Sequence, residues 1–215
     1  MNRFAVLAQG FEHLSYPLDR HDAAEGSTFS ERSLSFTLGR SQSETHAQMA
    51  LVSADGLSEH AAEPVGYVCA QEGEIFVVCR NVGRAGKSLA SDELGAASLA
   101  IVKRLAMLHS QGFGCGGLSP DAVEFCGKEA KILNPSRIFA LADGDSIYYE
   151  TVSTLRAIAS AGAASEKELP RLASAYVSHS PVCRHEISEH LKKKGVRAPP
   201  AQALADAAIK LVPYF

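Results

Sequence analysis

Apolar and polar residues alternate along several short segments in the first 80 residues. SLSFTLGR (33–40) has the two-residue period of a half-buried strand. VGYVCA (65–70) and EIFVVC (74–79) are rich in Val, Ile, Phe and Tyr, and the QEGE sequence that joins them is typical of a tight turn. These segments predict three strands, of which the last two form an antiparallel hairpin.

Between those strands the pattern becomes that of a helix. Ser41 and Glu44 form an S-x-x-E capping box, in which each side chain bonds a backbone N–H group that the first helical turn leaves without a partner. The sequence therefore predicts a helix from residue 41 to about residue 54, and Gly56 is a natural stop for it.

The second half of the chain has the period of α-helices. From Ser88 to Gln111 apolar residues recur every three or four positions, at Ala97, Ile101, Leu105 and Leu108. AVEF and AKIL flank CGKE, which predicts a hairpin, and the segments after Tyr148 predict helices. Strands first and helices second predict an α+β fold with two lobes, residues 1–82 and 83–215.

Composition narrows the class of protein. The 215 residues are 46% hydrophobic and 21% charged, as in ordinary folded proteins, and the net charge of -3 gives no field that would recruit nucleic acid or an anionic membrane. The five cysteines form no C-x-x-C pair, which favours a reducing cytoplasm over a disulfide framework. We expect neither a signal peptide nor a membrane span.

The segment LAMLHSQGFGCGGLSPDAVEFCGKEAKILNPSRIFAL (105–141) resembles the catalytic core of the protein kinase-like superfamily, especially its small bacterial and archaeal branch with an H-G-D-L-x-P-x-N loop. The matching residues are Leu108, His109, Gly112, Leu118, Ser119 and Pro120. The resemblance implies a reduced antiparallel N-lobe and a shortened helical C-lobe. It also implies that the helix at 41–54 is the family's αC helix and that YYETVSTLRAIAS is the buried helix that organises the larger lobe.

The same resemblance implies that the chemistry of the family is lost. Within the degenerate loop at 113–123, Cys115 stands at the family's His, Gly117 at the catalytic carboxylate and Ala122 at the loop Asn. Asn134, with Pro135 and Ser136, replaces the metal-binding D-F-G. Phosphoryl transfer needs carboxylates to orient the nucleophile and to hold Mg²⁺, and these positions supply none.

Two further features of the resemblance point the same way. Residues 1–40 contain no G-x-G-x-x-G loop, and Arg40 stands where a Lys is expected. Asp121 has the place of a helix or turn cap. The resemblance therefore implies a pseudokinase: a binding or regulatory module with an unidentified protein partner and no cofactor, and it leaves open a weak nucleotide binding that needs no metal.

A rival hypothesis is a nucleotide-dependent enzyme, either an atypical small-molecule kinase or a P-loop-like NTPase. NVGRAGKS (81–88) lacks one glycine of the phosphate-binding loop G-x-x-x-x-G-K-[ST], and its binding residues would be Gly83, Gly86, Lys87 and Ser88. Such a loop needs a long helix that starts at its Lys-Ser pair, and we expect Gly95 to interrupt that helix. The alternative is a Gly-rich hinge with a solvated Lys87.

Other candidate residues have simpler explanations. Cys183, His185 and His190 have a spacing that fits no structural zinc pattern, so we expect ordinary histidines on a surface helix. His109 is assigned to packing, and the basic run 192–194 to a solvated helix end. A third hypothesis is a small interaction protein whose likeness to kinases is accidental.

Overall fold

The structure is a computed structural model of the chain. It describes the backbone of residues 2–4, 16–18, 28–31, 34–38, 59–69, 75–80, 84–85, 89, 91–133, 138–141 and 144–211, and side chains in 59–62, 89, 93–133, 138–141 and 144–210. The chain divides into two compact units, Met1–Gly83 with Lys131–Ile138, and Arg84–Ala130 with Phe139–Phe215. The fold is α+β.

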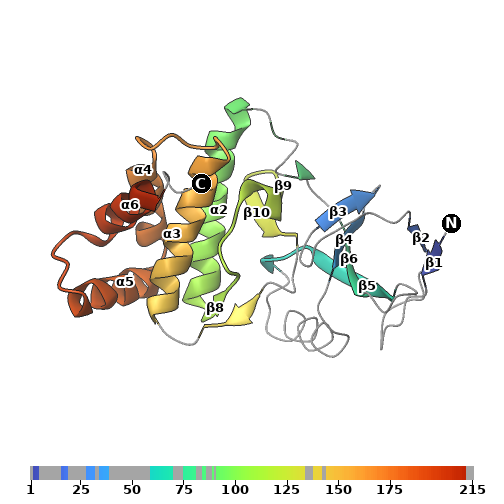
Figure 1. The fold of residues 1–215 in the computed structure, drawn as a ribbon, viewed down its shortest axis with the longest axis horizontal. Helices are drawn as coiled ribbons and strands as arrows, with labels where there is room; N and C mark the ends of the chain where they lie inside the picture. Colours follow the sequence, from blue (N-terminus) through green and yellow to red (C-terminus); the bar gives the residue numbers. More distant parts are fainter. Residues whose placement is uncertain are drawn as a thin grey trace. The chain divides into compact units, whose positions relative to one another are not determined.

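The first unit is built on a four-stranded antiparallel sheet with the order β3-β4-β6-β5 (Figure 1). Its strands are β3 (Thr28–Glu31), β4 (Leu34–Leu38), β5 (Glu63–Cys69) and β6 (Ile75–Arg80). The predicted hairpin is confirmed, because Val68 lies opposite Phe76 and Cys69 opposite Ile75. Strands β1 (Asn2–Phe4) and β2 (Tyr16–Leu18) form a separate antiparallel pair.

The helix predicted at 41–54 lies outside the described residues. Residues 60–62 are tied to Ile132 by backbone hydrogen bonds, Ala62 N to Ile132 O at 2.7 Å and Ile132 N to His60 O at 2.8 Å. These bonds explain why a short segment from late in the chain belongs to the first unit.

The second unit contains the helices that the structure describes. They are α2 (Ser91–Ser110), α3 (Gly144–Ser160), α4 (Leu169–His179), α5 (Pro181–Lys193) and α6 (Pro200–Leu211). Helix α3 lies beside α2, and both contact α4 and α5 (Figure 1). The predicted apolar stripe of α2 is confirmed, because all four of its residues are buried in this core.

Two details of the predicted helices were wrong. Helix α2 starts at Ser91 rather than at Ser88, and it passes through Gly95 without a break. One glycine costs a helix only about 1 kcal/mol, and the burial of one face of a 20-residue helix outweighs that cost.

Short strands connect the helices of this unit. The hairpin predicted around CGKE is confirmed as β9 (Val123–Cys126) and β10 (Glu129–Ile132), and Gly127 (φ +64°) makes the turn. Strand β7 (Arg84–Ala85) extends this sheet beside β9, while β8 (Phe113–Gly114) pairs with β11 (Phe139–Ala140). Among the described helices, none combines the length and apolar character that a membrane span requires.

Candidate functional site

The loop between α2 and β9 carries the residues that the sequence places at catalytic positions. Helix α2 ends at Ser110, and Gly112 turns the chain at a φ of +83°, with its N–H donating to His109 O at 3.0 Å. The chain then passes through β8 to Cys115 and ends in a short 3-10 turn, η3 (Pro120–Ala122).

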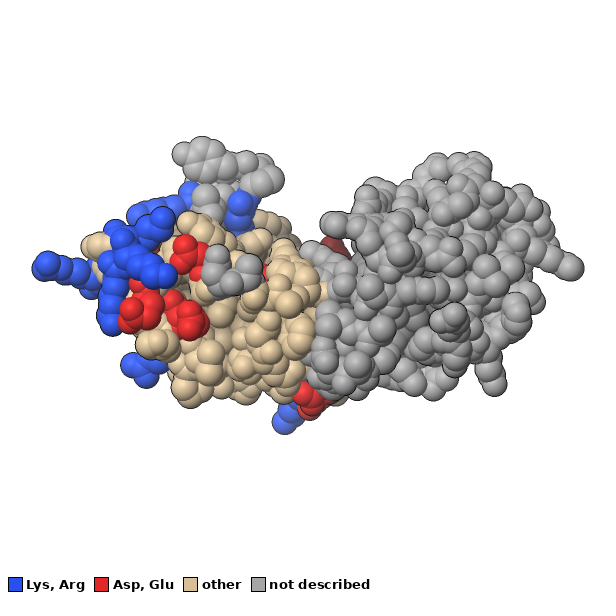
Figure 2. Space-filling view, turned by 90° about the horizontal axis from the view of Figure 1, so that it is seen from below, with Lys and Arg blue, Asp and Glu red and all other residues tan. Residues whose placement is uncertain are grey.

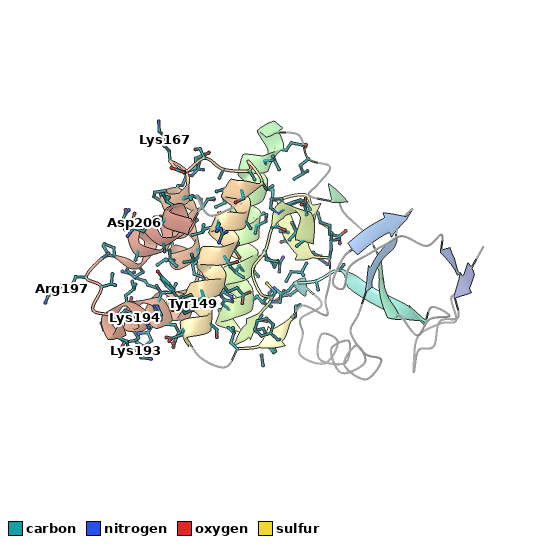
Figure 3. All side chains as sticks on the ribbon, in the orientation of Figure 1. Tyr149, Lys167, Lys193, Lys194, Arg197 and Asp206 are labelled. Atoms are coloured by element: carbon teal, nitrogen blue, oxygen red, sulfur yellow. The ribbon has the colours of Figure 1, made fainter. Side chains whose placement is uncertain are left out.

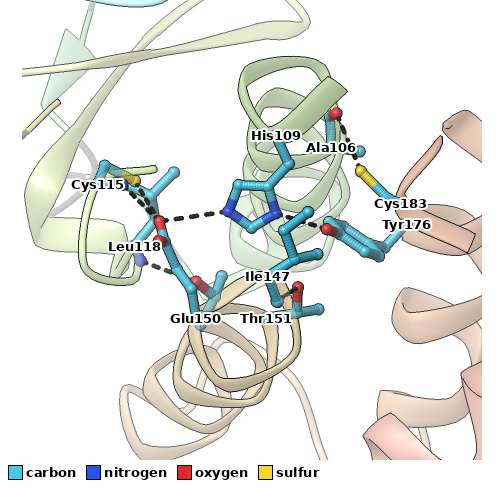
Figure 4. Close-up of polar contacts among 10 residues, drawn as sticks. Ala106, His109, Cys115, Leu118, Ile147, Glu150, Thr151, Tyr176 and Cys183 are labelled. Carbon is cyan, nitrogen blue, oxygen red and sulfur yellow. Dashed lines mark hydrogen bonds and ion pairs between the residues drawn. The ribbon is translucent and has the colours of Figure 1, made fainter. Parts of the chain in front are cut away.

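Helix α3 holds this loop through two polar side chains. Glu150 Oε1 accepts hydrogen bonds from the backbone N–H of Cys115 at 2.6 Å and from its Sγ at 3.1 Å (Figure 4). Thr154 Oγ1 accepts from the N–H of Leu118 at 2.9 Å. Residues four apart share one face of a helix, so one face of α3 fixes the backbone of the loop at Cys115 and at Leu118.

Glu150 also approaches His109, on α2. The carboxylate Oε1 lies 3.5 Å from His109 Nε2, which is an ion-pair distance, and His109 Nδ1 lies 2.5 Å from the Tyr176 hydroxyl of α4. Above Tyr176 in Figure 4, Cys183 of α5 directs its Sγ toward Ala106 O of α2 at 3.6 Å. Four helices therefore meet at one buried polar cluster, which consists of His109, Cys115, Glu150, Tyr176 and Cys183.

Burial and pairing act in opposite directions on the ionisable groups of this polar cluster. Burial lowers the pKa of His109, but its contacts with Cys183 and Glu150 outweigh burial and raise that pKa above 6.5. Burial raises the pKa of Glu150, but His109 and the Cys115 N–H lower it below 4.5. The pair is therefore stabilised in its charged form, in which Nδ1–H of His109 donates to the Tyr176 hydroxyl, while Nε2–H faces Glu150 at ion-pair distance and makes no hydrogen bond.

The polar cluster is structural, because substrates cannot reach it. His109, Cys115, Tyr176 and Cys183 are each at most 1% exposed. The expectation that His109 has a packing role agrees with this burial. The role of the polar cluster is therefore to hold the loop from Cys115 to Leu118 in one conformation.

The loop backbone is pressed against α3. Gly117 is buried with a φ of +91°, and a Cβ placed on it would lie 3.0 Å from Ser153 Oγ and 3.3 Å from Ser153 Cβ. A Cβ on Gly114 would lie 2.5 Å from Glu150 Oε2. Ordinary side chains rarely adopt such a φ, so both the conformation and the space favour glycine at position 117.

The other predicted site residues fall in different places. Ala122 ends η3, where its N–H donates to Ser119 O at 3.0 Å, and Asp121 beside it is exposed. Asn134 and the P-loop-like residues Gly83, Gly86, Lys87 and Ser88 lie outside the described residues. Within that motif, Arg84–Ala85 forms strand β7 opposite Phe125 and Glu124.

Comparisons with known proteins give distant likenesses in structure. No family model matches the sequence, and no curated protein matches it. Vaccinia related kinase 3 is 10% identical with a TM-score of 0.36, over 56% of this chain and 54% of that chain. A divergent kinase that lacks the glycine-rich loop and regulates membrane ultrastructure of the Toxoplasma parasitophorous vacuole is 11% identical with a TM-score of 0.45, over 80% of this chain and 66% of that chain.

Likenesses at these TM-scores support no conclusion about function, which therefore depends on the geometry of the chain itself. The matched part spans about half of the first of these chains, and both TM-scores are below 0.5. Both of these structures are described as kinases.

The remaining histidine and cysteine candidates do not converge. In the part of the chain that the structure describes, no three His, Cys, Asp or Glu side chains are placed to hold a metal ion. His185 is exposed, whereas His190 is buried, donates its Nδ1–H to Asp145 Oδ1 at 2.8 Å, and stacks on Tyr148. The expectation of surface histidines was therefore wrong for His190, because two aromatic rings and a carboxylate of α3 cover it.

The basic run forms the exposed end of the helical unit. Figure 2 shows Lys and Arg gathered at that end with Asp and Glu among them, and Figure 3 places Lys193, Lys194 and Arg197 there. Lys192 pairs with Glu189 at 2.6 Å. Positive side chains at a helix C-terminus interact favourably with its dipole, which agrees with the expected solvated helix end.

The residues that sequence reasoning missed are Glu150, Thr154 and Tyr176. A signal for Glu150 was present, because it shares the buried face of α3 with Ile147, Thr151, Thr154, Leu155 and Ile158. A carboxylate on an otherwise buried face needs a partner, so its position indicates a polar contact in the core.

Proposed function

We propose that this chain is a catalytically inactive, kinase-like binding or regulatory module. The observation that carries the proposal is Gly117, which stands where the resemblance implies the catalytic carboxylate. Its φ of +91° and the 3.0 Å approach of Ser153 Oγ to a Cβ at this position disfavour any side chain there, an acidic one included.

The support for a kinase-like frame comes from the tethered loop. Resemblance assigns Cys115 and Leu118 to the catalytic loop, and both donate their backbone N–H to side chains of α3. The protein has therefore kept a costly arrangement, a buried carboxylate, whose effect is to fix the shape of a loop. A fixed loop that carries no acidic side chain from Cys115 to Leu118 is suited to holding a partner rather than to moving a phosphoryl group.

The proposed module presents a surface of defined shape to another protein and needs no bound cofactor. Nucleotide, if it binds, does so weakly and without Mg²⁺, because the aligned positions offer Mg²⁺ no carboxylate. The P-loop alternative no longer has the expected break at Gly95 against it, because α2 is continuous there, but α2 begins at Ser91, after the Lys87-Ser88 pair, and residues 84–85 lie in a strand.

The test combines nucleotide binding with phosphoryl transfer. Thermal unfolding of the full chain is measured with ATP and EDTA, with ATP and Mg²⁺, and with neither, and transfer from labelled ATP is measured in parallel. We expect no transfer and no stabilisation that depends on Mg²⁺. Mg²⁺-dependent stabilisation together with turnover would contradict the proposal.

Variants then identify the source of any activity that appears. Loss of phosphoryl transfer in Asp121→Asn would identify Asp121 of the loop as the catalytic acid. Loss in Glu124→Gln would identify the buried Glu124 of β9. Loss in Lys87→Ala would favour the P-loop alternative. The matched control is Asp206→Asn, because Asp206 lies on α6, away from the loop (Figure 3).

A further inference from the structure

A second feature of the helical unit lies on the face of α2 that turns toward the β9–β10 hairpin (Figure 1). A half-open pocket of about 550 Å³ forms there. Its described lining residues come from the segment before α2, from α2 itself and from the hairpin: Leu89, Glu93, Ala96, Ala97, Leu99, Ala100, Lys103, Phe125, Gly127 and Lys128. Pockets that bind small molecules usually have about 300–1,000 Å³, so this volume suits a small ligand.

The hollow exists because the helix carries small residues where it faces a large one. Ala96, Ala97 and Ala100 occupy adjacent turns of α2, opposite the ring of Phe125 on β9. Three methyl groups cannot fill the space between a helix and a hairpin, so an apolar floor remains accessible. Apolar surface of this kind gains free energy when an apolar ligand covers it.

The two walls are held together by a buried residue, so the pocket is formed before a ligand arrives. Arg104 of α2 donates its Nε–H to Ala130 O of β10 at 2.6 Å, and its Nη2 lies 3.4 Å from Glu129 Oε2. Arg104 is 4% exposed. A buried guanidinium that bridges helix and hairpin keeps the spacing of the walls constant, which lowers the entropy lost on binding.

The charges at the pocket select the sign of the ligand. Lys103 on α2 and Lys128 in the hairpin turn are both exposed, and neither makes an ion pair within the residues that the structure describes. Glu93, the acid among the described lining residues, already has an interaction partner. Two ammonium groups from two different elements therefore border an apolar floor.

We propose that this pocket binds a small amphipathic anion, with an apolar body on the alanine and Phe125 floor and a carboxylate or similar acidic group between Lys103 and Lys128. The site lies within one unit and shares no residue with the loop from Cys115 to Ala122. The inference therefore does not rest on the proposed function, and either one can fail alone.

The experiment uses the full chain and a fluorescent apolar anion, 1-anilinonaphthalene-8-sulfonate, as the probe. Displacement of the probe is measured with decanoate, decanol and decyltrimethylammonium, which share an apolar chain and differ in charge. We expect decanoate to displace the probe at the lowest concentration. Equal displacement by all three, or stronger displacement by the cation, would overturn the assignment of an anionic ligand.

Variants locate the binding. Lys103→Gln with Lys128→Gln should weaken decanoate about tenfold or more, because hydrogen bonds to charged groups are the stronger ones, and should leave decanol unchanged. Lys194→Gln is the control, since Lys194 is an exposed lysine at the end of α5, away from α2 (Figure 3). An equal loss in the control, or no loss in the double variant, would refute a role for the two lysines.

A last variant fills the pocket. Ala96→Phe should abolish displacement by decanoate and by decanol, and Ala96 is exposed, so the larger ring does not enter the core. Ala96→Leu provides a smaller change if the phenylalanine variant does not fold, as judged by circular dichroism. Unchanged binding in the folded variant would overturn the site.

Discussion

Replacing Gly117 with alanine tests whether the loop requires a glycine there. The backbone at Gly117 has a φ of +91°, and an added Cβ would approach Ser153 Oγ at 3.0 Å and Ser153 Cβ at 3.3 Å. The change adds one methyl group and no charge. It therefore measures backbone strain and crowding against α3, and nothing that depends on a ligand.

The expected cost has two parts. A residue with a side chain pays about 1–2 kcal/mol in the left-handed region of φ. Crowding in a packed region costs about 1–3 kcal/mol. The lower end applies because Ser153 can turn its hydroxyl away, so that only its Cβ still crowds the added methyl group. We expect Gly117→Ala to lower the free energy of unfolding by about 2–3 kcal/mol.

Urea unfolding followed by the helical circular dichroism signal measures this free energy, since the chain contains no tryptophan. The matched control is Gly162→Ala, because Gly162 has a φ of +69° and a Cβ there would meet no atom within 4 Å. Gly162→Ala should lower the free energy of unfolding only by the cost of the backbone conformation, about 1–2 kcal/mol. Ser153→Ala in the Gly117→Ala background should recover part of the difference.

The reasoning fails if the two glycine variants lose equal stability, because crowding against Ser153 would then contribute nothing. It also fails if Gly117→Ala is as stable as the wild type. A further variant, Gly117→Asp, returns an acid to this position. We expect it to be less stable than Gly117→Ala and to show no phosphoryl transfer, whereas a stable and active Gly117→Asp would refute the proposed role of the position.

Three further predictions concern the buried contacts. Glu150→Ala should cost about 3–5 kcal/mol in urea unfolding, because it leaves His109 without its charged partner; a loss below 1 kcal/mol would show that the pair is unimportant. Unfolding measured against pH should give maximal stability between 4.5 and 6.5. Because the pKa of His109 is raised, its contribution to stability is complete below pH 6.5 and is lost as the pH rises through the pKa of the folded state. Because the pKa of Glu150 is lowered, its contribution is complete above pH 4.5 and is lost as the pH falls. His109→Gln should flatten the alkaline side of the profile, and an unchanged profile would contradict the pairing. Ser98→Ala should cost about 1 kcal/mol, since Ser98 Oγ donates to Ala163 O at 2.9 Å, and an unchanged midpoint would show that this bond adds no stability.

The sequence by itself determined the features that depend on neighbours along the chain. The hairpin at β5 and β6, the hairpin at β9 and β10 and the buried stripe of α2 follow from periods of two or between three and four residues, which local geometry imposes. The absence of acidic side chains at Cys115, Gly117 and Ala122 could also be read directly from the sequence.

Only the tertiary structure decided which residues meet. Glu150 and Cys115 are 35 positions apart, and His109 and Tyr176 are 67 apart, so their contacts arise from how the helices pack. The same packing keeps α2 continuous through Gly95 and buries His190, because the free energy of burial exceeds local preferences of about 1 kcal/mol. Local patterns fix elements, whereas pairing of distant polar groups requires the positions of those elements in space.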